Sequence, residues 1–414
     1  MKKILFCLAF LGLAVAGEAQ VYNNPVTHRS LPDPTVMRGD DGYFYLMATE
    51  DTHNIPVMKS KDLVNWNYLR TAFTDATRPD YYCEHGWAFW APDVNKIGNN
   101  YVLYYSHGVW GHGDECAIGV ATSKRIYGPY SNSKVLFTSP EIGVNNSIDP
   151  CFFQDEDGKN YLFWGSFNDI YMIELSEDGL SIAEGAEKKK VAGGIMEAAY
   201  VFKHDKYYYL IGSAGSCCEG ANSTYRLVMA RSNKVTGPYV DKNGRAATGD
   251  NMSELLHRSA QVYGPGHCSE WQIDDNGDYW ILYHGFQADN VDQGRVTYLD
   301  KVLWDTKGWP YIKNDIPSVE SEVPYFATSA IKGVTDDNLS YKVSVAEGLY
   351  QLLIESPDNS SFTWRITAPN GSLLKQGRAD KSLNVWTTDL TNGLYIVTVC
   401  GKYGTYSQKV FINQ

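Results

Sequence analysis

Five short segments of the 414-residue sequence each carry one ionisable side chain at a similar place in a repeated pattern. The segments are LPDPTV, WAPDV, SIDPCFF, IMEAAYVF and GPGHCSEW, and their ionisable residues are Asp33, Asp93, Asp149, Glu197 and His267. Each precedes a tyrosine-led apolar stretch by 8 to 12 residues. One Asp-Pro pair alone is usually only a turn cap, but five ionisable residues in register, one in each repeat, favour a shared site.

Clustered carboxylates indicate acid–base hydrolysis or metal binding. The sequence has no GxSxG, no HExxH and no phosphate-cradling glycine loop, so serine-nucleophile, zinc-peptidase and nucleotide chemistry are not indicated. Hydrolysis of a glycosidic bond needs one carboxyl that donates a proton and a second that activates water or attacks the sugar. A third carboxylate nearby raises the pKa of the acid by like-charge repulsion. Three clustered carboxyls fit this scheme.

The tyrosine-led stretches mark the elements that would position these side chains. Turn residues precede each stretch, and the aligned tyrosines are Tyr43, Tyr101, Tyr161, Tyr208 and Tyr279. A second strand-like pattern follows each of them, and no run shows helical periodicity. Five such units predict an all-β fold, a five-bladed β-propeller over residues 20–317. The first strand of each blade would line the central axis and bring the five ionisable side chains together.

Composition and the first residues narrow the class of partner and the location. The formal net charge of −12 argues against nucleic acid or an anionic membrane, whereas a neutral ligand remains possible. Residues 1–19 read as a signal peptide, with two lysines, an apolar run from Ile4 to Ala16 and small residues before the cleavage point. No stretch is long enough to span a membrane. We therefore expect a secreted or cell-surface protein.

The cysteines and the long loops carry no recognisable motif. Seven cysteines remain after the leader, without CxxC spacing, and we do not predict that they bind metal. Cys217 and Cys218 are adjacent, and the sequence leaves their redox state open. The stretch GVWGHGDECAIG, from residue 108, is interpreted as an inter-strand loop at the rim of the cleft. Residues 71–86 form another long segment, which would favour exo action if it closed one end of the cleft.

Over residues 25–315 the sequence resembles glycoside hydrolase family 43, a family of five-bladed propellers, through LPDPTV, FWAPDV, SIDPCFFQDEDGKNYLFWGSF and MEAAYVF. The run from SCCEG to TGPYVDKNG is similar to that of the endo-1,5-α-L-arabinanases. The resemblance implies that Asp33 is the general base, that Glu197 is the general acid, and that Asp149 orients the acid and tunes its pKa. It also implies inversion, which places acid and base about 6.5–9.5 Å apart. One departure is Ala199, where relatives usually carry Pro.

The same resemblance implies residues that bind ligands. His267 would help to hold a calcium ion at the propeller axis, mainly through water, because calcium prefers oxygen ligands. Four residues would contact the substrate, with the two aromatic ones as sugar platforms: Phe89, Trp90, Asn146 and Ser166. Packing around the site is the alternative role for all four, and Asp93 itself is expected to be structural.

The implied substrate is arabinan, a neutral plant cell-wall polysaccharide, cut at internal α-1,5-L-arabinofuranosidic bonds. Two alternatives remain within the family, an exo-acting α-L-arabinofuranosidase and a β-xylosidase. A non-catalytic carbohydrate-binding propeller is a third, although no carboxylate is missing. Invertase-like propellers match less well, since their Asn-Asp-Pro-Asn and Arg-Asp-Pro signatures are absent.

The sequence changes character after Pro317. Residues 318–338 are polar and predict a linker, and the short alternating strands of residues 339–414 predict a small β-sandwich. The ending GLYIVTVCGKYGTYSQKVFINQ resembles the C-terminal sorting domain of the type IX secretion system, which implies export through that machinery. A carbohydrate-binding module is the alternative, with Trp364 and Trp386 as its main candidate residues.

Overall fold

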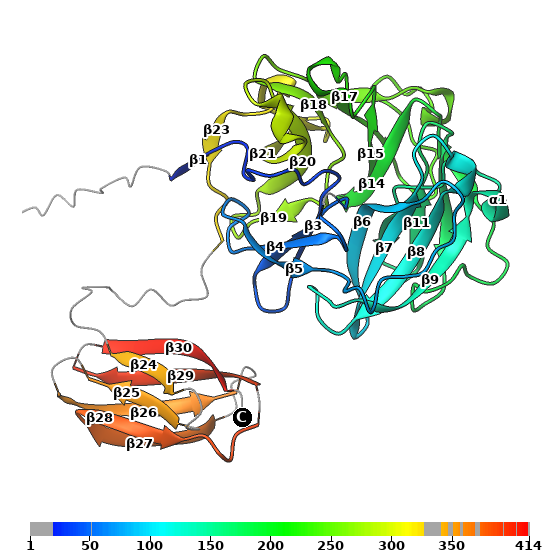
Figure 1. Ribbon diagram of the computed structural model, residues 1–414. Coiled ribbons are helices and arrows are strands. Elements are labelled where there is room, and N and C mark those ends of the chain that lie inside the picture. Colours follow the sequence, from blue (N-terminus) through cyan, green and yellow to red (C-terminus); the bar gives the residue numbers. More distant parts are fainter. Residues whose placement is uncertain are drawn as a thin grey trace, which may run out of the picture. The chain divides into compact units, whose positions relative to one another are not determined.

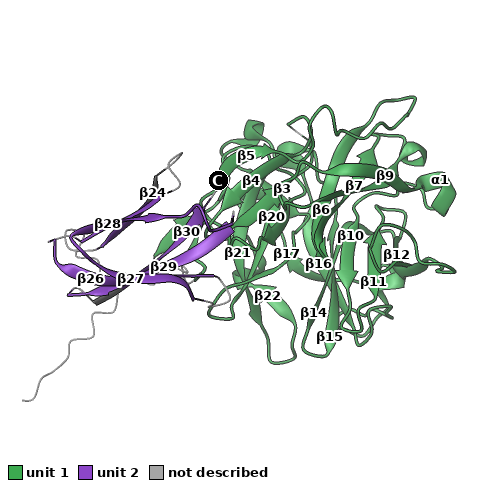
Figure 2. Ribbon diagram, turned by 90° about the horizontal axis from the view of Figure 1, so that it is seen from below, with its two compact units in different colours: residues 1–326 green, residues 327–414 purple. Residues whose placement is uncertain are grey.

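The computed structural model divides the chain into two compact units, residues 1–326 and residues 327–414 (Figure 2). It describes residues 20–326 except residue 51, and residues 341–412 except 347–350, 357–358, 369–372, 392 and 403. The predicted signal peptide, residues 1–19, lies outside the described residues. None of the helices found in these ranges is long and apolar enough to cross a membrane.

The described part of the first unit contains five antiparallel sheets of at least four strands, numbered here sheet 1 to sheet 5 along the chain (Figure 1). Sheet 1 consists of β2 (Thr35–Arg38), β3 (Phe44–Met47), β4 (Pro56–Ser60) and β5 (Asn67–Thr71). Sheet 2 consists of β6 (Ala88–Ile97), β7 (Asn100–Gly108), β8 (Ala117–Ser123) and β9 (Ser131–Thr138). Sheet 3 consists of β10 (Cys151–Gln154), β11 (Asn160–Trp164), β12 (Ile170–Leu175) and β13 (Lys189–Ala192). Sheet 4 consists of β14 (Met196–His204), β15 (Tyr207–Ala214), β16 (Arg226–Ser232) and β17 (Ser253–Leu256). Sheet 5 is β18–β22, with strands Val262–Gly266, Gln272–Ile273, Tyr279–Gln287, Val296–Trp304 and Pro310–Ile312.

Helical structure in the described residues is limited to short turns between strands. These are α1 (Ser139–Ile142) and the 3₁₀ turns η1 (Gly113–Glu115), η2 (Gly220–Asn222), η3 (Ala247–Gly249), η4 (Val291–Gln293) and η5 (Lys313–Asp315). The all-β class predicted from the strand patterns is confirmed.

Apolar side chains join each sheet to the next. One buried cluster joins sheets 1 and 2, and three more join sheets 2 and 3, sheets 3 and 4, and sheets 4 and 5. A fifth cluster joins sheet 5 to sheet 1, where Trp280 and Leu282 pack with Phe44 and Leu46. The tyrosine-led second strands supply much of this packing, because both of their faces are covered by neighbouring sheets.

In each of the five sheets, one residue with a left-handed backbone conformation lies in or next to the first strand. The positions are Asp33, Ala91, Asp149, Ala198 and His267, with φ between 42° and 60°. Non-glycine residues seldom adopt this conformation, so its recurrence marks one structural position repeated five times.

This register corrects one expectation about the ring of ionisable residues. Ala91, and not Asp93, occupies the position in sheet 2 that Asp33 and Asp149 occupy in sheets 1 and 3. Asp93 lies two residues further along β6, where its carboxylate accepts the backbone N–H of Phe152 at 2.6 Å. Asp93 therefore ties sheet 2 to sheet 3 and does not join the other predicted residues.

The end of the first unit differs from the predicted boundary at residue 317. The strand β23 (Glu320–Glu322) pairs with β1 (Val21–Asn23), and Phe326 packs on Phe44 with ring centroids 4.6 Å apart. Residues 318–326 thus belong to the first unit and not to a linker, because both backbone pairing and aromatic packing hold them there. The rest of the predicted linker, residues 327–338, lies outside the described residues.

The second unit contains two antiparallel sheets in its described residues. One has the order β24–β25–β28 (Lys342–Ala346, Gln351–Glu355, Ser382–Trp386). The other has the order β27–β26–β29–β30 (Leu373–Asp380, Ser361–Thr367, Gly393–Gly401, Gly404–Ile412). Side chains from both sheets, such as Leu352 and Val397, form one hydrophobic cluster. Two sheets that face a common core are what a β-sandwich requires.

Candidate active site

Asp33 lies directly before β2 and is surrounded by positive charge. Its Oδ1 is 3.0 Å from a guanidinium nitrogen of Arg295 and 3.2 Å from Nδ1 of His267. Its Oδ2 accepts a hydrogen bond from the hydroxyl of Thr49 at 2.5 Å. Burial by itself would raise the pKa of Asp33, but Arg295 and His267 outweigh it and hold the pKa well below its usual value. Asp33 is therefore an ionised carboxylate, able to accept a proton from water.

Two histidines beside Asp33 carry different charges. The backbone N–H of Asp33 donates to Nδ1 of His284 at 3.1 Å, so this nitrogen is unprotonated. Burial, together with the charge of Arg295, lowers the pKa of His284 to about 4, which leaves its ring neutral. Burial would also lower the pKa of His267, but the charge of Asp33 and its hydrogen bond raise that pKa above the ordinary value. His267 thus carries the charge that pairs with Asp33.

Glu197 is the second residue of β14, and both of its carboxylate oxygens accept hydrogen bonds. The hydroxyl of Ser166 donates to Oε2 at 2.5 Å, and the hydroxyl of Tyr225 donates to Oε1 at 2.8 Å. Burial raises the pKa of Glu197, while these two hydrogen bonds work against the rise. The net shift is upward, as a proton donor requires.

Asp149 lies beside Glu197 and is coupled to it electrostatically. Its Oδ2 accepts the backbone N–H of Ala198, the residue after Glu197, at 3.0 Å. Its own backbone N–H donates to the hydroxyl of Ser106 at 3.0 Å. Burial raises the pKa of Asp149 to about 8; His267 opposes this rise and the charge of Glu197 adds to it. A negative charge on either carboxyl therefore disfavours ionisation of the other.

The three carboxyls provide opposite protonation states within one cluster. They remain slightly open to solvent, with exposed fractions of 9%, 6% and 9% for Asp33, Asp149 and Glu197. One side of the cluster holds an ionised carboxylate and the other retains a proton. Two titratable groups whose pKa values are shifted in opposite directions are what general acid–base catalysis requires.

The two aromatic residues predicted to contact substrate, Phe89 and Trp90, differ in their surroundings. Phe89 is fully buried and stacks on Phe73, with ring centroids 4.9 Å apart. Its ring has no face free for a sugar, so the structure places it in the core between sheets 1 and 2.

Trp90, in contrast, is half-buried and lies against a glycine. A β-carbon on Gly108 would come within 1.9 Å of the Trp90 ring, so the ring needs the space above Gly108. The exposed ring of Trp110 meets Trp90 edge to face, with centroids 6.3 Å apart. The role of Trp90 as a sugar platform stays a prediction, and Trp110 is a neighbour that no sequence pattern marked.

Asn146 and Ser166 form a line of hydrogen bonds that ends at Glu197. The Nδ2 of Asn146 donates to the Ser166 hydroxyl at 2.9 Å, and that hydroxyl donates to Glu197. Ser166 is buried, so it orients Glu197 and does not present itself to solvent. Asn146 is half-buried and is the member of the line closer to solvent.

The surroundings of His267 do not form a calcium cage built from protein oxygens. Its Nδ1 faces Asp33, whose Oδ1 also binds the cation Arg295. Calcium takes six to eight oxygen ligands, and a guanidinium at the same carboxylate oxygen competes with a metal ion. A calcium ion held by His267 and water remains a prediction, and no chemical step depends on it.

Several residues around the carboxyls were not identified from the sequence. Thr49 follows the tyrosine-led strand of sheet 1, and Ser106, Ser213 and His284 lie within the tyrosine-led strands of sheets 2, 4 and 5. Each accepts the backbone N–H of the left-handed residue in the next sheet, namely Ala91, Asp149, His267 and Asp33. The sequence does mark these positions, because a small or polar residue follows the apolar part of each tyrosine-led stretch. Arg295 and Tyr225 lie outside that repeat, and no sequence pattern marked them.

The adjacent cysteines on the loop after β15 are joined. Cys217 and Cys218 form a disulfide, which answers the question that the sequence left open. The other cysteines in the described residues are not in disulfides, namely Cys83, Cys116, Cys151, Cys268 and Cys400.

Comparison with known proteins places this site in a family. Residues 22–310 match the model of the glycosyl hydrolases family 43. The chain belongs to this family. It is therefore a glycoside hydrolase, and inversion of configuration is typical of the family.

Family 43 relatives of the chain include both endo- and exo-acting enzymes. It is 32% identical over 305 residues to an extracellular exo-α-(1→5)-L-arabinofuranosidase of Cellvibrio japonicus, covering 68% of this chain and 85% of that one. It is 31% identical over 292 residues to an extracellular endo-α-(1→5)-L-arabinanase of Bacillus subtilis, covering 68% and 87%. The structure of a Cellvibrio cellulosa α-L-arabinanase complexed with arabinohexaose is similar, with 29% identity, a TM-score of 0.62 and coverage of 69% and 96%.

Proposed function

We propose that this chain hydrolyses internal α-1,5-L-arabinofuranosidic bonds of arabinan, with inversion at the anomeric carbon. The observation that carries the proposal is the contrast between Asp33, whose pKa is held low by Arg295 and His267, and Glu197, whose pKa is raised by burial. The names of the relatives, both endo- and exo-acting on α-1,5-linked arabinose, support the substrate.

In the proposed mechanism Glu197 donates its proton to the leaving glycosidic oxygen while Asp33 removes a proton from the attacking water. Asp149 helps to keep a proton on the acid side of the site, because a negative charge on either of the two carboxyls disfavours ionisation of the other. The hydrogen bonds from Ser166 and Tyr225 fix the direction of the Glu197 carboxyl. The water attacks from the face opposite the leaving group, so the product has the inverted configuration.

The experiment that tests this function is an analysis of the early products from linear α-1,5-arabinan. Arabino-oligosaccharides of mixed length support internal cleavage, and arabinose alone supports the exo-acting alternative, which the Cellvibrio japonicus relative favours. Xylan and an aryl xyloside test the β-xylosidase alternative. No product from any substrate would support the binding propeller and contradict the proposal. Proton NMR of the first product then reports whether configuration is inverted.

We also propose that the five sheets of the first unit are the blades of one propeller. The buried cluster between sheets 5 and 1, and the pairing of β1 with β23, support a closed ring. A crystal structure of residues 20–326 tests the closure, and a gap between sheets 5 and 1 would contradict it.

For the second unit we propose a sorting function in type IX export, as its resemblance implies. Of the two tryptophans considered for the rival sugar-binding role, only Trp386 is strongly exposed, at 59%. Removal of residues 327–414 should retain the enzyme inside a host that uses this secretion route, while the activity of the purified protein stays the same. Normal export of the shortened chain would contradict this role, and loss of binding to insoluble arabinan would support the carbohydrate-binding module.

A further inference from the structure

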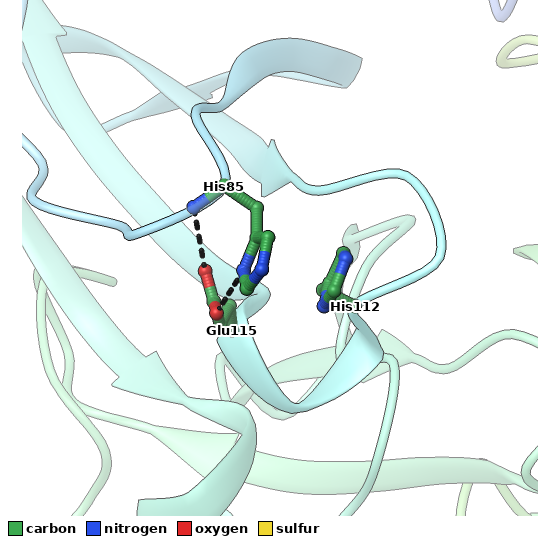
Figure 3. Close-up of side chains that lie close together, drawn as sticks. All are labelled: His85, His112 and Glu115. Atoms are coloured by element: carbon green, nitrogen blue, oxygen red, sulfur yellow. Dashed lines mark hydrogen bonds and ion pairs between the residues drawn. The ribbon is translucent and has the colours of Figure 1, made fainter.

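Two loops beside the active site bring together two histidines and a carboxylate. His85 lies between β5 and β6, whereas His112 and Glu115 lie on the connection between β7 and β8, at η1 (Figure 3). One ligand atom from each of the three residues lies within 4.8 Å of the other two. This is the one group of three or more His, Cys, Asp or Glu residues with that spacing in the part of the chain that the structure describes.

The contacts within the group are close. Nδ1 of His85 lies 2.6 Å from Oε1 of Glu115, and the imidazole rings of His85 and His112 stack with centroids 3.5 Å apart. The thiol of Cys83 donates to the second carboxylate oxygen of Glu115. Four side chains of types that bind transition metals therefore converge from two loops.

We propose that His85, His112 and Glu115 bind a divalent transition-metal ion, zinc in particular, and that Cys83 completes the coordination. Imidazole nitrogen, carboxylate oxygen and thiolate sulfur form the mixed ligand set that zinc accepts in tetrahedral geometry. Zinc–ligand bonds of about 2.0–2.3 Å require the ligand atoms to draw together from their present spread, a small movement for side chains on loops. On binding, the Cys83 thiol loses its proton to solvent and turns from Glu115 to the metal.

The backbone around this cluster is anchored, whereas its side chains remain accessible. Glu115 accepts the Tyr81 hydroxyl on its backbone oxygen at 2.6 Å, a bond that joins the two loops. Cys116, the next residue, is buried. The side chains of His85 and Glu115 keep 43% and 23% of their surface exposed, so an ion can enter from solvent.

Other exposed His–Glu contacts in the described residues lack this convergence. His257 lies 3.1 Å from Glu254, and His53 lies 3.3 Å from Glu50 and 3.5 Å from Asp75, so that in each case a single histidine meets carboxylates. Ion pairing alone explains those contacts. It does not explain why a second imidazole and a thiol gather at Glu115.

The position of the cluster gives the ion a consequence for the active site. The β7–β8 connection that carries His112 also carries Trp110, and the backbone carbonyl of Gly113 accepts the N–H of Asn146 at 2.9 Å. Asn146 leads through Ser166 to Glu197. A metal that joins the two loops would therefore hold the Trp110 side of the site and the start of this hydrogen-bond line.

Elemental analysis of the full-length secreted chain, purified without a histidine tag and dialysed against zinc, tests the proposal independently of activity. We expect about one zinc per chain in the parent protein and in the control His257→Ala, and none in His112→Ala or Glu115→Ala. Cobalt substitution should give visible d–d absorption together with a near-ultraviolet thiolate band, and only the thiolate band should disappear in Cys83→Ser.

Thermal unfolding provides the second readout. A ligand that binds only the folded state raises the melting temperature, so a zinc-selective chelator should lower it in the parent protein and in His257→Ala, but not in His112→Ala. Zinc retained by both cluster variants, or no zinc in the parent, would overturn the proposal. An inactive protein that still binds zinc in this pattern would contradict the proposed function alone.

Discussion

The guanidinium of Arg295 lies 3.0 Å from Oδ1 of Asp33, while the hydroxyl of Thr49 binds Oδ2 of the same carboxylate. Arg295 comes from the segment before β21, far from Asp33 in sequence, and no motif marked it. The contact explains how a buried aspartate stays ionised, since the Coulombic gain from Arg295 opposes the cost of burial.

Replacement of Arg295 by Ala should weaken the proposed base in a recognisable way. Loss of a charged hydrogen bond, about 1.5–3 kcal/mol, predicts a fall in kcat/KM of roughly 10–100-fold. Because Arg295 lowers the pKa of Asp33, its removal should also move the acidic limb of the pH profile to higher pH. Arg38→Ala, which removes a surface contact with Asp275 at 3.6 Å, is the matched control. An unchanged acidic limb would contradict this role.

Substitution of each proposed catalytic carboxyl separates their tasks. Asp33→Ala, Asp149→Ala and Glu197→Ala should each lower kcat on arabinan by about 10²–10⁴-fold, because each removes a proton-transfer group or its partner. An aryl arabinobioside with a good leaving group needs little protonation, so the Glu197 variant should recover much of its rate there and the Asp33 variant should not. Glu254→Gln, at an exposed position on β17, serves as control, and equal losses on both substrates would contradict the assignment.

The repeats in the sequence predicted much of the site because they repeat in the backbone. Asp33, Asp149 and His267 stand at the same left-handed position in three sheets, so their spacing from the tyrosine-led strands revealed a common location. The same rule was wrong for Asp93, because Ala91 takes the corresponding position in sheet 2 and Asp93 comes two residues later.

Residues that act through long-range contacts were beyond such reasoning. Arg295 reaches Asp33 only because sheet 5 packs on sheet 1, and Tyr225 reaches Glu197 from the segment before β16. Burial also determines the role of Phe89. The sequence shows an aromatic residue near the site, but only its packing on Phe73 shows that its ring faces are covered.

The pH profile of kcat/KM should fall on its alkaline side with the Asp149–Glu197 pair. Burial raises the pKa of both groups, that of Asp149 to about 8, so a proton is present below this value and is lost above it. On the acidic side Asp33 stays ionised, since its pKa is held well below 3.8, and activity should persist until the pH falls through that low pKa. Steady-state rates from pH 3 to 10 check this, and an alkaline limb near the ordinary pKa of glutamate, about 4.3, would contradict it.

Ser166→Ala should shift the alkaline limb upward. The hydrogen bond from Ser166 favours the ionised form of Glu197, so its loss raises the pKa of the acid. Loss of the hydrogen bond, worth about 1.5 kcal/mol or more to a charged acceptor, should also reduce kcat by roughly 10-fold, because the carboxyl is less well oriented. Ser253→Ala, on the outer strand β17, should change neither quantity. A lower kcat with no shift of the limb would indicate only a structural role for Ser166.

Gly108→Ala tests whether Trp90 binds sugar. The added methyl group would lie 1.9 Å from the indole, so the ring must move away from its place over Gly108. Loss of a stacking platform should raise KM for arabinan by about 2- to 10-fold, as stacking contacts are worth roughly 0.5–1.5 kcal/mol, and leave the rate on a short aryl substrate nearly unchanged. Gly393→Ala, where the nearest atom to an added β-carbon is 4.0 Å away, should leave both values alone. If kcat falls equally on both substrates, Trp90 supports the fold of the site and not the binding of a polysaccharide.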